Sequence, residues 1–114
     1  MASVGATVVE VSKKPIIGVL STGNELVEPK MKPNGPYIRN SNAWQLSAQI
    51  INAGAIPVYF GIVKDNRKKL LESINNGIEK CDILLLTGGV SAGEFDFVPD
   101  ILKELNAEIL FKSI

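Results

Sequence analysis

Hydrophobic residues along the chain fall either into short continuous runs or into runs spaced like one face of a helix. The continuous runs are residues 15–20, 55–63 and 81–87. Their lengths and β-branched content predict buried strands, and the unbroken apolar stretch in 81–87 predicts burial on both faces, as in a parallel sheet. The closing segment AEILFKSI, residues 107–114, predicts a fourth strand.

Three other segments have helical spacing. Residues 40–54 begin with capping candidates and end at Gly54, a typical C-terminal stop. Residues 64–80 begin with Asp65 and Asn66 as N-cap candidates, and a third helix is expected from Pro99 through Leu105. The residues expected to face inward are Trp44, Leu46, Ile50, Ile51, Leu70, Leu71, Ile74, Ile78, Val98, Ile101, Leu102 and Leu105.

Alternating strands and helices predict right-handed βαβ crossovers, and therefore a three-layer α/β/α sandwich with a mostly parallel sheet. We expect one domain over residues 15–114, truncated at its C-terminus and cut from a longer protein. Residues 1–14, with the strand-like stretch 2–11, are expected to be an entry segment from a preceding domain. Residues 28–38 contain three prolines and an Asn-Gly pair, which predict an exposed excursion or hairpin.

Composition narrows the function classes. Lys plus Arg and Asp plus Glu are 12 each, so no global charge favours nucleic acid or an anionic membrane. No apolar run is long enough to span a bilayer, and the start does not resemble a secretion signal. One cysteine and no histidine exclude an internal disulfide and the common zinc sites. We therefore expect a cytoplasmic protein.

Two predicted strands end in a Thr-Gly step, at Thr22–Gly23 and at Thr87–Gly88–Gly89. In a parallel sheet both turns leave from the carboxyl edge, where open α/β folds bind ligands at the point of strand-order reversal. Glycine lets backbone N–H groups approach an anion, and a following helix N-terminus adds partial positive charge. The alternative is that both steps are only tight turns.

The second glycine loop fits neither common phosphate motif. A dinucleotide fingerprint needs glycine where the chain has Val90. A P-loop needs lysine after its second glycine, whereas Gly93 is followed by Glu94, whose charge is opposite. The loop is therefore a different kind of anion site, or a turn.

Carboxylates also collect near this edge, namely Glu25, Asp65 and Asp96. Together with an anion they would suit a hard cation such as Mg²⁺, which prefers oxygen ligands. Asp65 and Asp96 have the alternative role of helix caps, and Glu94 that of a solvated turn residue. Ser91 is either a donor to an oxyanion or a residue chosen for small size.

Four motifs together resemble the molybdenum-cofactor biosynthesis domain, in the version of the molybdopterin molybdotransferase family to which the C-terminal region of gephyrin is related. They are STGNEL (21–26), YIRNSN (37–42), GIVKDN (61–66) and TGGVSAGEFDF (87–97). The resemblance extends from Pro15 onward. Val90–Ser91 and GEFD differ from the loops of the adenylyltransferase branch and of the competence-damage-inducible proteins.

The resemblance implies an enzyme that inserts molybdate into adenylylated molybdopterin and releases AMP, assisted by magnesium. It implies that Glu25, Asp65 and Asp96 form an acidic, cation-binding and catalytic pocket. Residues implied to bind molybdopterin or an anion are Thr22, Gly23, Asn40, Asn42, Gly88, Gly89 and Ser91, with Asn40 and Asn42 on the nucleotide side. Many relatives have aspartate at Asn40, so a charge-dependent role is not expected at this position. Relatives also often have arginine at Lys64, and a lysine there lacks the bidentate contact with an oxyanion that arginine could make.

The resemblance also implies that the active enzyme needs other domains and a second subunit, as a dimer or other homo-oligomer. The isolated chain is therefore expected to bind ligand at most. Other readings are a non-catalytic scaffold or binding module, an adenylyltransferase-type activity and nucleotide-pyrophosphate cleavage. The acid set favours the molybdotransferase over a scaffold.

Overall fold

A computed structural model describes residues 1–88 and 97–111. Its main sheet contains β1 (Ile16–Thr22), β4 (Ile56–Val63) and β5 (Ile83–Thr87), in the order β4-β1-β5. Both pairings are parallel, with β1 in the centre. The three strands confirm the predictions from residues 15–20, 55–63 and 81–87.

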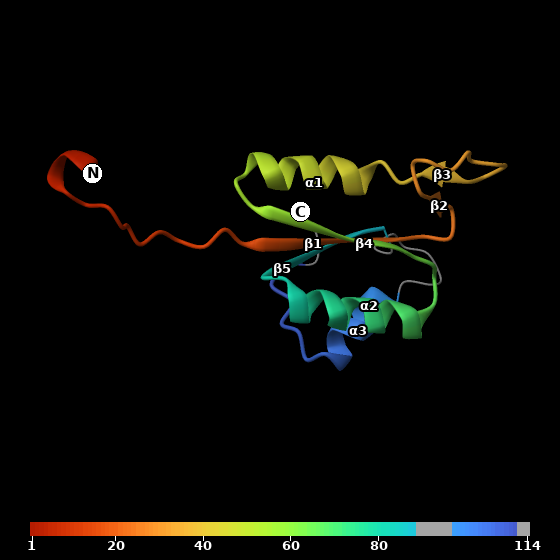
Figure 1. Ribbon diagram of the computed structural model, residues 1–114. Coiled ribbons are helices and arrows are strands. Elements are labelled where there is room, and N and C mark those ends of the chain that lie inside the picture. Colours follow the sequence, from red (N-terminus) through yellow and green to blue (C-terminus); the bar gives the residue numbers. More distant parts are fainter. Residues whose placement is uncertain (89–96, 112–114) are drawn as a thin grey trace.

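Helices cover both faces of this sheet (Figure 1). Helix α1 (Asn42–Asn52) lies on one face, and α2 (Arg67–Lys80) and α3 (Val98–Glu104) lie on the other. The predicted three-layer α/β/α sandwich is therefore confirmed. None of the helices in the described residues has the length and hydropathy that a membrane span requires.

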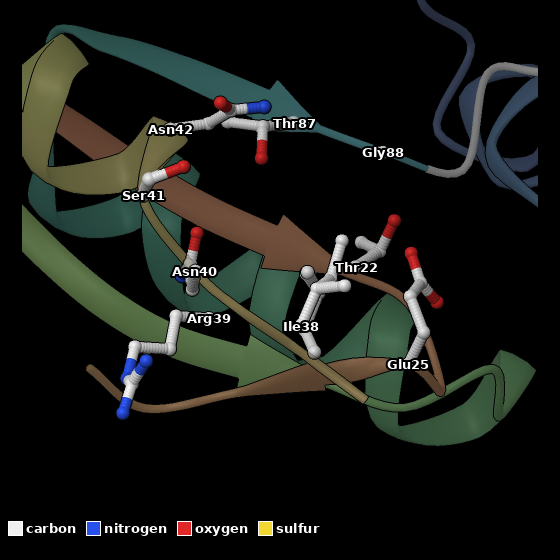
Figure 2. A pocket seen from close by; sticks show the side chains of 10 residues that line it. Thr22, Glu25, Ile38, Arg39, Asn40, Ser41, Asn42, Thr87 and Gly88 are labelled. Atoms are coloured by element: carbon white, nitrogen blue, oxygen red, sulfur yellow. The ribbon is translucent and has the colours of Figure 1, made fainter. Parts of the chain in front are cut away.

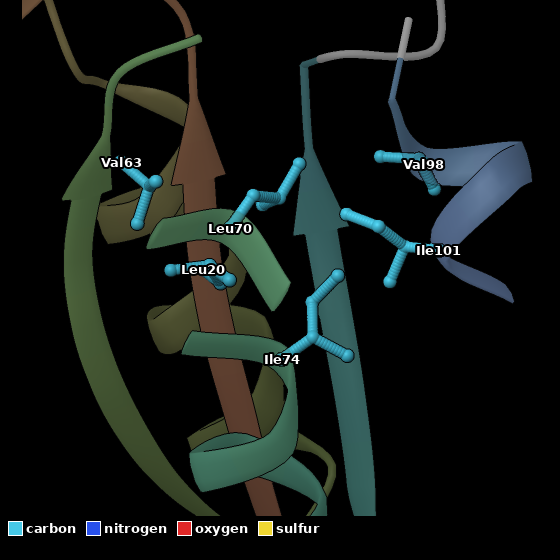
Figure 3. Packing of buried hydrophobic residues seen from close by; sticks show 6 residues of the cluster. All are labelled: Leu20, Val63, Leu70, Ile74, Val98 and Ile101. Atoms are coloured by element: carbon cyan, nitrogen blue, oxygen red, sulfur yellow. The ribbon is translucent and has the colours of Figure 1, made fainter. Parts of the chain in front are cut away.

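The central strand divides the hydrophobic core into two layers, because successive side chains of a strand point to opposite faces. Leu20 is fully buried toward α2 and α3, where it belongs to a cluster with Leu70, Ile74 and Ile101 (Figure 3). Val19, also fully buried, packs on the other side with Ala43 and Ile50 of α1. The core therefore lies on both faces of β1.

The helix ends show which capping predictions were right. Gly54, with φ +85°, follows the last turn of α1, and its N–H donates to the carbonyl of Ile51 at 2.9 Å. The N-cap of α2 is Asn66, whose side chain accepts a hydrogen bond from the Lys69 N–H at 3.0 Å. The alternative that Asp65 caps this helix is wrong, so its carboxylate is not used there.

Three residues expected in the core are instead exposed: Trp44 by 56%, Ile51 by 60% and Ile78 by 55%. Each helix packs against one face of the sheet and therefore buries only a narrow apolar stripe, which Ala43 and Ile50 form on α1. Trp44 instead lies against Tyr59, with ring centroids 5.8 Å apart. Leu102 and Leu105 pack inward on α3 as predicted.

The chain ends and the excursion also differ from expectation. Residues 107–111 contain no strand, and the stretch 2–11 contains only a short 3₁₀ helix, η1 (Ala2–Val4), because a strand requires a neighbouring backbone to pair with. The excursion is exposed, but it is not a hairpin. Strands β2 (Leu26–Val27) and β3 (Ile38–Arg39) pair in parallel, so the chain between them makes a complete loop.

Candidate functional site at the carboxyl edge of the sheet

The carboxyl ends of β1 and β5 enclose a cavity of about 140 Å³ (Figure 2). The chain leaves β1 toward β4 on one side and later returns to β5 on the other, so strand order reverses between β1 and β5. This is the place where open α/β sheets bind ligands. The cavity is lined by Thr22, Glu25, Leu26, Ile38, Arg39, Asn40, Ser41, Asn42, Thr87 and Gly88.

Both Thr-Gly steps have a positive φ that favours glycine, and at Gly88 a backbone contact requires it as well. A Cβ on Gly88, which has φ +84°, would lie 2.2 Å from the carbonyl oxygen of Thr22. A Cβ on Gly23, which has φ +147°, would lie 2.6 Å from a carboxylate oxygen of Glu25. The glycines therefore let the two strand ends, and the Glu25 side chain, come together around the cavity.

Thr22 brings an unpaired hydroxyl to this cavity. The residue is 3% exposed, and its Oγ1 has no hydrogen-bond partner among the described residues. Buried polar groups are almost always paired, and an unpaired one costs free energy. A bound oxyanion would accept the hydrogen bond that this hydroxyl has to give.

The first turn of α1 forms another wall of the cavity. Ser41 is its N-cap and makes no side-chain capping bond, and Asn42 is its first helical residue. N–H groups at the start of a helix lack intrahelical acceptors and carry partial positive charge. Figure 2 shows Asn42 beside Thr87, whereas Thr22 lies farther along the cavity, toward Ile38 and Glu25. The first turn of α1 and the unpaired hydroxyl therefore belong to different parts of the same lining.

Within the described part of the chain, two charged residues line the cavity, Glu25 and Arg39. The sequence did not single out Arg39, although it lies within the YIRNSN motif, because an exposed arginine in a two-residue strand has no pattern that marks it. Its Nε donates to the carbonyl of Pro29 at 3.0 Å, which fixes the start of the side chain and leaves the other guanidinium donors available.

Asn40 lines the cavity but directs its amide beneath it. The residue is 1% exposed, and its Nδ2 donates to Ser21 Oγ at 2.9 Å and to Tyr59 Oη at 2.8 Å. Its Oδ1 accepts from the Ala43 N–H at 3.4 Å. Asn40 therefore ties β1, β4 and α1 together at the floor of the site.

The acids predicted to form one pocket are only partly brought together. Glu25 lines the cavity, whereas Asp65 lies beside the same loop, with its backbone N–H donating to Asn24 Oδ1 at 3.2 Å, but outside the lining. No group of three His, Cys, Asp or Glu side chains among the described residues is arranged to hold a metal. The predicted residues Gly89, Ser91 and Asp96 lie outside the described residues, as does Glu94.

The fold and this cavity define a class: an open α/β domain with a pocket at the reversal point of its sheet. Residues 18–114 match the family model described as "Probable molybdopterin binding domain". Because the match covers most of the chain, the chain belongs to this molybdopterin-binding domain family.

Curated relatives and solved structures agree with this assignment. The chain is 40% identical, over all 114 residues, to the molybdopterin molybdenumtransferase of Bacillus subtilis (strain 168), and covers 26% of that protein. It is 41% identical over 106 residues to the enzyme of that name from Nostoc, covering 93% of the chain and 24% of the relative. A molybdopterin biosynthesis MoeA protein from Pyrococcus horikoshii superposes with a TM-score of 0.72 at 27% identity, over 81% of this chain and 22% of that one.

Proposed function

We propose that this chain is the molybdopterin-binding domain of an enzyme that inserts molybdate into adenylylated molybdopterin and releases AMP. Its relatives carry the name molybdopterin molybdenumtransferase, and the chain spans about a quarter of the length of those relatives. The complete reaction therefore belongs to a longer protein, in which we propose that other domains and a second subunit complete the active site, in the cytoplasm.

The observation that carries this proposal is the unpaired, buried Oγ1 of Thr22 in a cavity at the sheet edge. We assign Thr22, Gly88 and Asn42 to an oxyanion, either molybdate or the pterin phosphate; the neighbouring N–H groups of Ser41 and Ala43 already donate to Arg39 and Asn40. A water molecule occupies about 30 Å³ of liquid, so a cavity of about 140 Å³ fits one tetrahedral oxyanion. A pterin nucleotide is larger, and its remainder would extend along the open edge past Asn42.

The described residues supply few of the oxygen ligands that the proposed magnesium ion needs. Glu25 supplies one carboxylate to the cavity, and Asp65 lies just outside it, which is too few ligands to hold a cation alone. We therefore propose Glu25, Asp65 and Asp96 together as the ligand set, with Asp96 adding a carboxylate to that of Glu25. When bound, magnesium would neutralise the repulsion between these acids and the oxyanion.

The experiment is reconstitution of the full-length protein with adenylylated molybdopterin and molybdate, followed by AMP release and molybdenum incorporation. Glu25→Gln, which removes the carboxylate that lines the cavity among the described residues, is expected to lower both rates at least about tenfold, or about 1.4 kcal/mol of transition-state stabilisation. The matched control is Glu72→Gln, an exposed acid on α2.

The two readings of the domain give different results. A molybdotransferase couples AMP release to molybdenum incorporation, and the Glu25 variant loses both. A scaffold or binding module binds molybdopterin without releasing AMP, even in the wild type, and that result would reject the proposed function.

A further inference from the structure

Five side chains form one continuous line of hydrogen bonds beneath the cavity. It starts at Thr87 on β5, passes Ser21 on β1, Asn40 before α1 and Tyr59 on β4, and ends at Glu28 in the excursion. The oxygen–oxygen separation is 3.3 Å for Thr87–Ser21, and Tyr59 Oη donates to Glu28 Oε1 at 3.0 Å. Thr87 and Asn40 line the cavity, whereas Glu28 does not.

The direction of this line is fixed at Asn40. Its Oδ1 faces the backbone N–H of Ala43, which can only donate, so the Nδ2 must face Ser21 and Tyr59. Tyr59 Oη therefore accepts a hydrogen bond from Asn40 and donates its own O–H to another acceptor. The acceptor for that proton is the Glu28 carboxylate.

Tyr59 keeps its proton under all ordinary conditions. Burial, together with the hydrogen bond to Glu28, raises the pKa of the Tyr59 hydroxyl to about 12. The Tyr59 hydroxyl therefore stays a donor to Glu28, and Glu28 remains an acceptor at the far end of the line.

The opposite end of the line faces the cavity. Ser21 is fully buried and accepts from Asn40, and among the described residues its remaining hydroxyl partner is Thr87. Either hydroxyl can donate in such a pair. When Ser21 donates to Thr87, the Thr87 hydroxyl is free to donate its own hydrogen bond toward the cavity, where an oxyanion would accept it.

We propose that Asn40, whose amide is held by Ala43 and Tyr59, acts through Ser21 as a positioning residue that makes Thr87 a hydrogen-bond donor to a bound oxyanion. Glu28 supports this amide from outside the cavity by accepting the hydrogen bond of Tyr59. The inference rests on the proposed function for the identity of that oxyanion. A carboxylate in place of the Asn40 amide would reverse the line: Ser21 and Tyr59 would both have to donate to it. Thr87 would then donate to Ser21 and present only lone pairs to the cavity.

The test uses Asn40→Asp, Glu28→Gln and the double variant in the full-length protein. Glu28→Gln alone preserves an acceptor for Tyr59, so the midpoint of urea unfolding should change little. In Asn40→Asp alone, the single Tyr59 O–H faces two carboxylates, the introduced one and Glu28, and can donate to only one of them. The midpoint of urea unfolding should therefore fall. In the double variant the introduced amide can donate to Tyr59, so the midpoint should recover part of the loss. Glu28→Gln therefore stabilises only when Asn40 is also changed, a coupling that a double-mutant cycle measures.

Molybdate affinity, measured by calorimetry, separates positioning from stability. Asn40→Asp and the double variant should both bind molybdate at least tenfold more weakly than the wild type. The double variant has the net charge of the wild type, so a loss there does not come from added overall charge. Additive changes in the unfolding midpoint, or wild-type molybdate affinity in the double variant, would overturn the inference.

The same measurements distinguish this inference from the proposed function. If the wild type binds neither molybdate nor inorganic phosphate, the proposed anion site fails, and the assignment of Thr87 as donor fails with it. If the wild type binds molybdate but the variants show no coupling, only the inference fails.

Discussion

The ammonium group of Lys64 lies 2.7 Å from the carbonyl oxygen of Asn24 and donates a hydrogen bond to it. The same group donates to the carbonyl of Leu26 at 2.8 Å, on the other side of Glu25. One side chain at the end of β4 therefore holds both flanks of the residue that brings a carboxylate to the cavity. The Tyr37 ring, 5.7 Å from the ammonium, covers it.

Lys64→Met should loosen this loop. It removes two charge-assisted hydrogen bonds to backbone carbonyls, which in a partly exposed position stabilise the fold by about 1–2 kcal/mol in total. Urea unfolding should show this loss, and Lys64→Arg, which retains the charge and several donors, should restore most of it. Lys68→Met, an exposed change on α2, serves as the control. Equal stability of Lys64→Met and Lys68→Met would show that the two hydrogen bonds of Lys64 do not stabilise the fold.

Gly88→Ala tests the close approach of β5 to β1. Gly88 and Gly54 have almost the same φ, +84° and +85°, but a Cβ at Gly54 meets nothing within 4 Å. Gly54→Ala should therefore cost only the strain of a left-handed alanine, about 1–2 kcal/mol. Gly88→Ala should cost about 2 kcal/mol more, because its Cβ collides with the Thr22 carbonyl.

Chemical unfolding of the two alanine variants measures this difference directly. Similar losses for both would mean that the ends of β1 and β5 can separate without cost, and that the cavity has no fixed width.

Tyr59 should make stability fall at high pH. Its pKa is about 12 in the fold and about 10 in the unfolded chain. The folded state therefore binds this proton more tightly, so the contribution is complete below pH 10 and is lost as pH rises from 10 to 12. Since the group is only partly buried, the total is no more than about 2 kcal/mol.

Stability of the wild type and of Tyr59→Phe, compared at each pH between 9 and 12, should converge as the pH rises. Absorbance titration should show one tyrosine of raised pKa in the wild type that Tyr59→Phe removes. Tyr37→Phe, which changes the other tyrosine of the chain, should leave that titration in place. A constant stability difference between the wild type and Tyr59→Phe across this range would contradict the pKa and the Glu28 hydrogen bond behind it.

Local patterns predicted much of the fold because they determine it. Short-range chemistry determines the apolar run of residues 15–20, the lengths of the strands and the end of a helix at Gly54. The remaining features depend on which other segments of the chain a residue packs against or pairs with. Trp44 has helical spacing but lies outside the stripe that the sheet covers, and residues 107–111 have strand-like composition without a strand to pair with.

The candidate site divides in the same way. Thr22, Gly23 and Gly88 could be predicted, because a Thr-Gly step after a buried strand places both at the carboxyl edge. The burial of Asn40 and its bonds to Ser21 and Tyr59 could not, since these residues are 19 positions away on either side and meet only in the folded sheet. No periodicity or motif marks that meeting.

The most direct test of the anion site is Thr22→Val in the full-length protein, with molybdate affinity and urea unfolding measured on the same sample. Valine has nearly the shape of threonine and removes the one buried hydroxyl that has no partner among the described residues. We predict unchanged or slightly greater stability together with at least tenfold weaker molybdate binding, and partial recovery of binding in Thr22→Ser. Wild-type affinity in Thr22→Val would contradict the account.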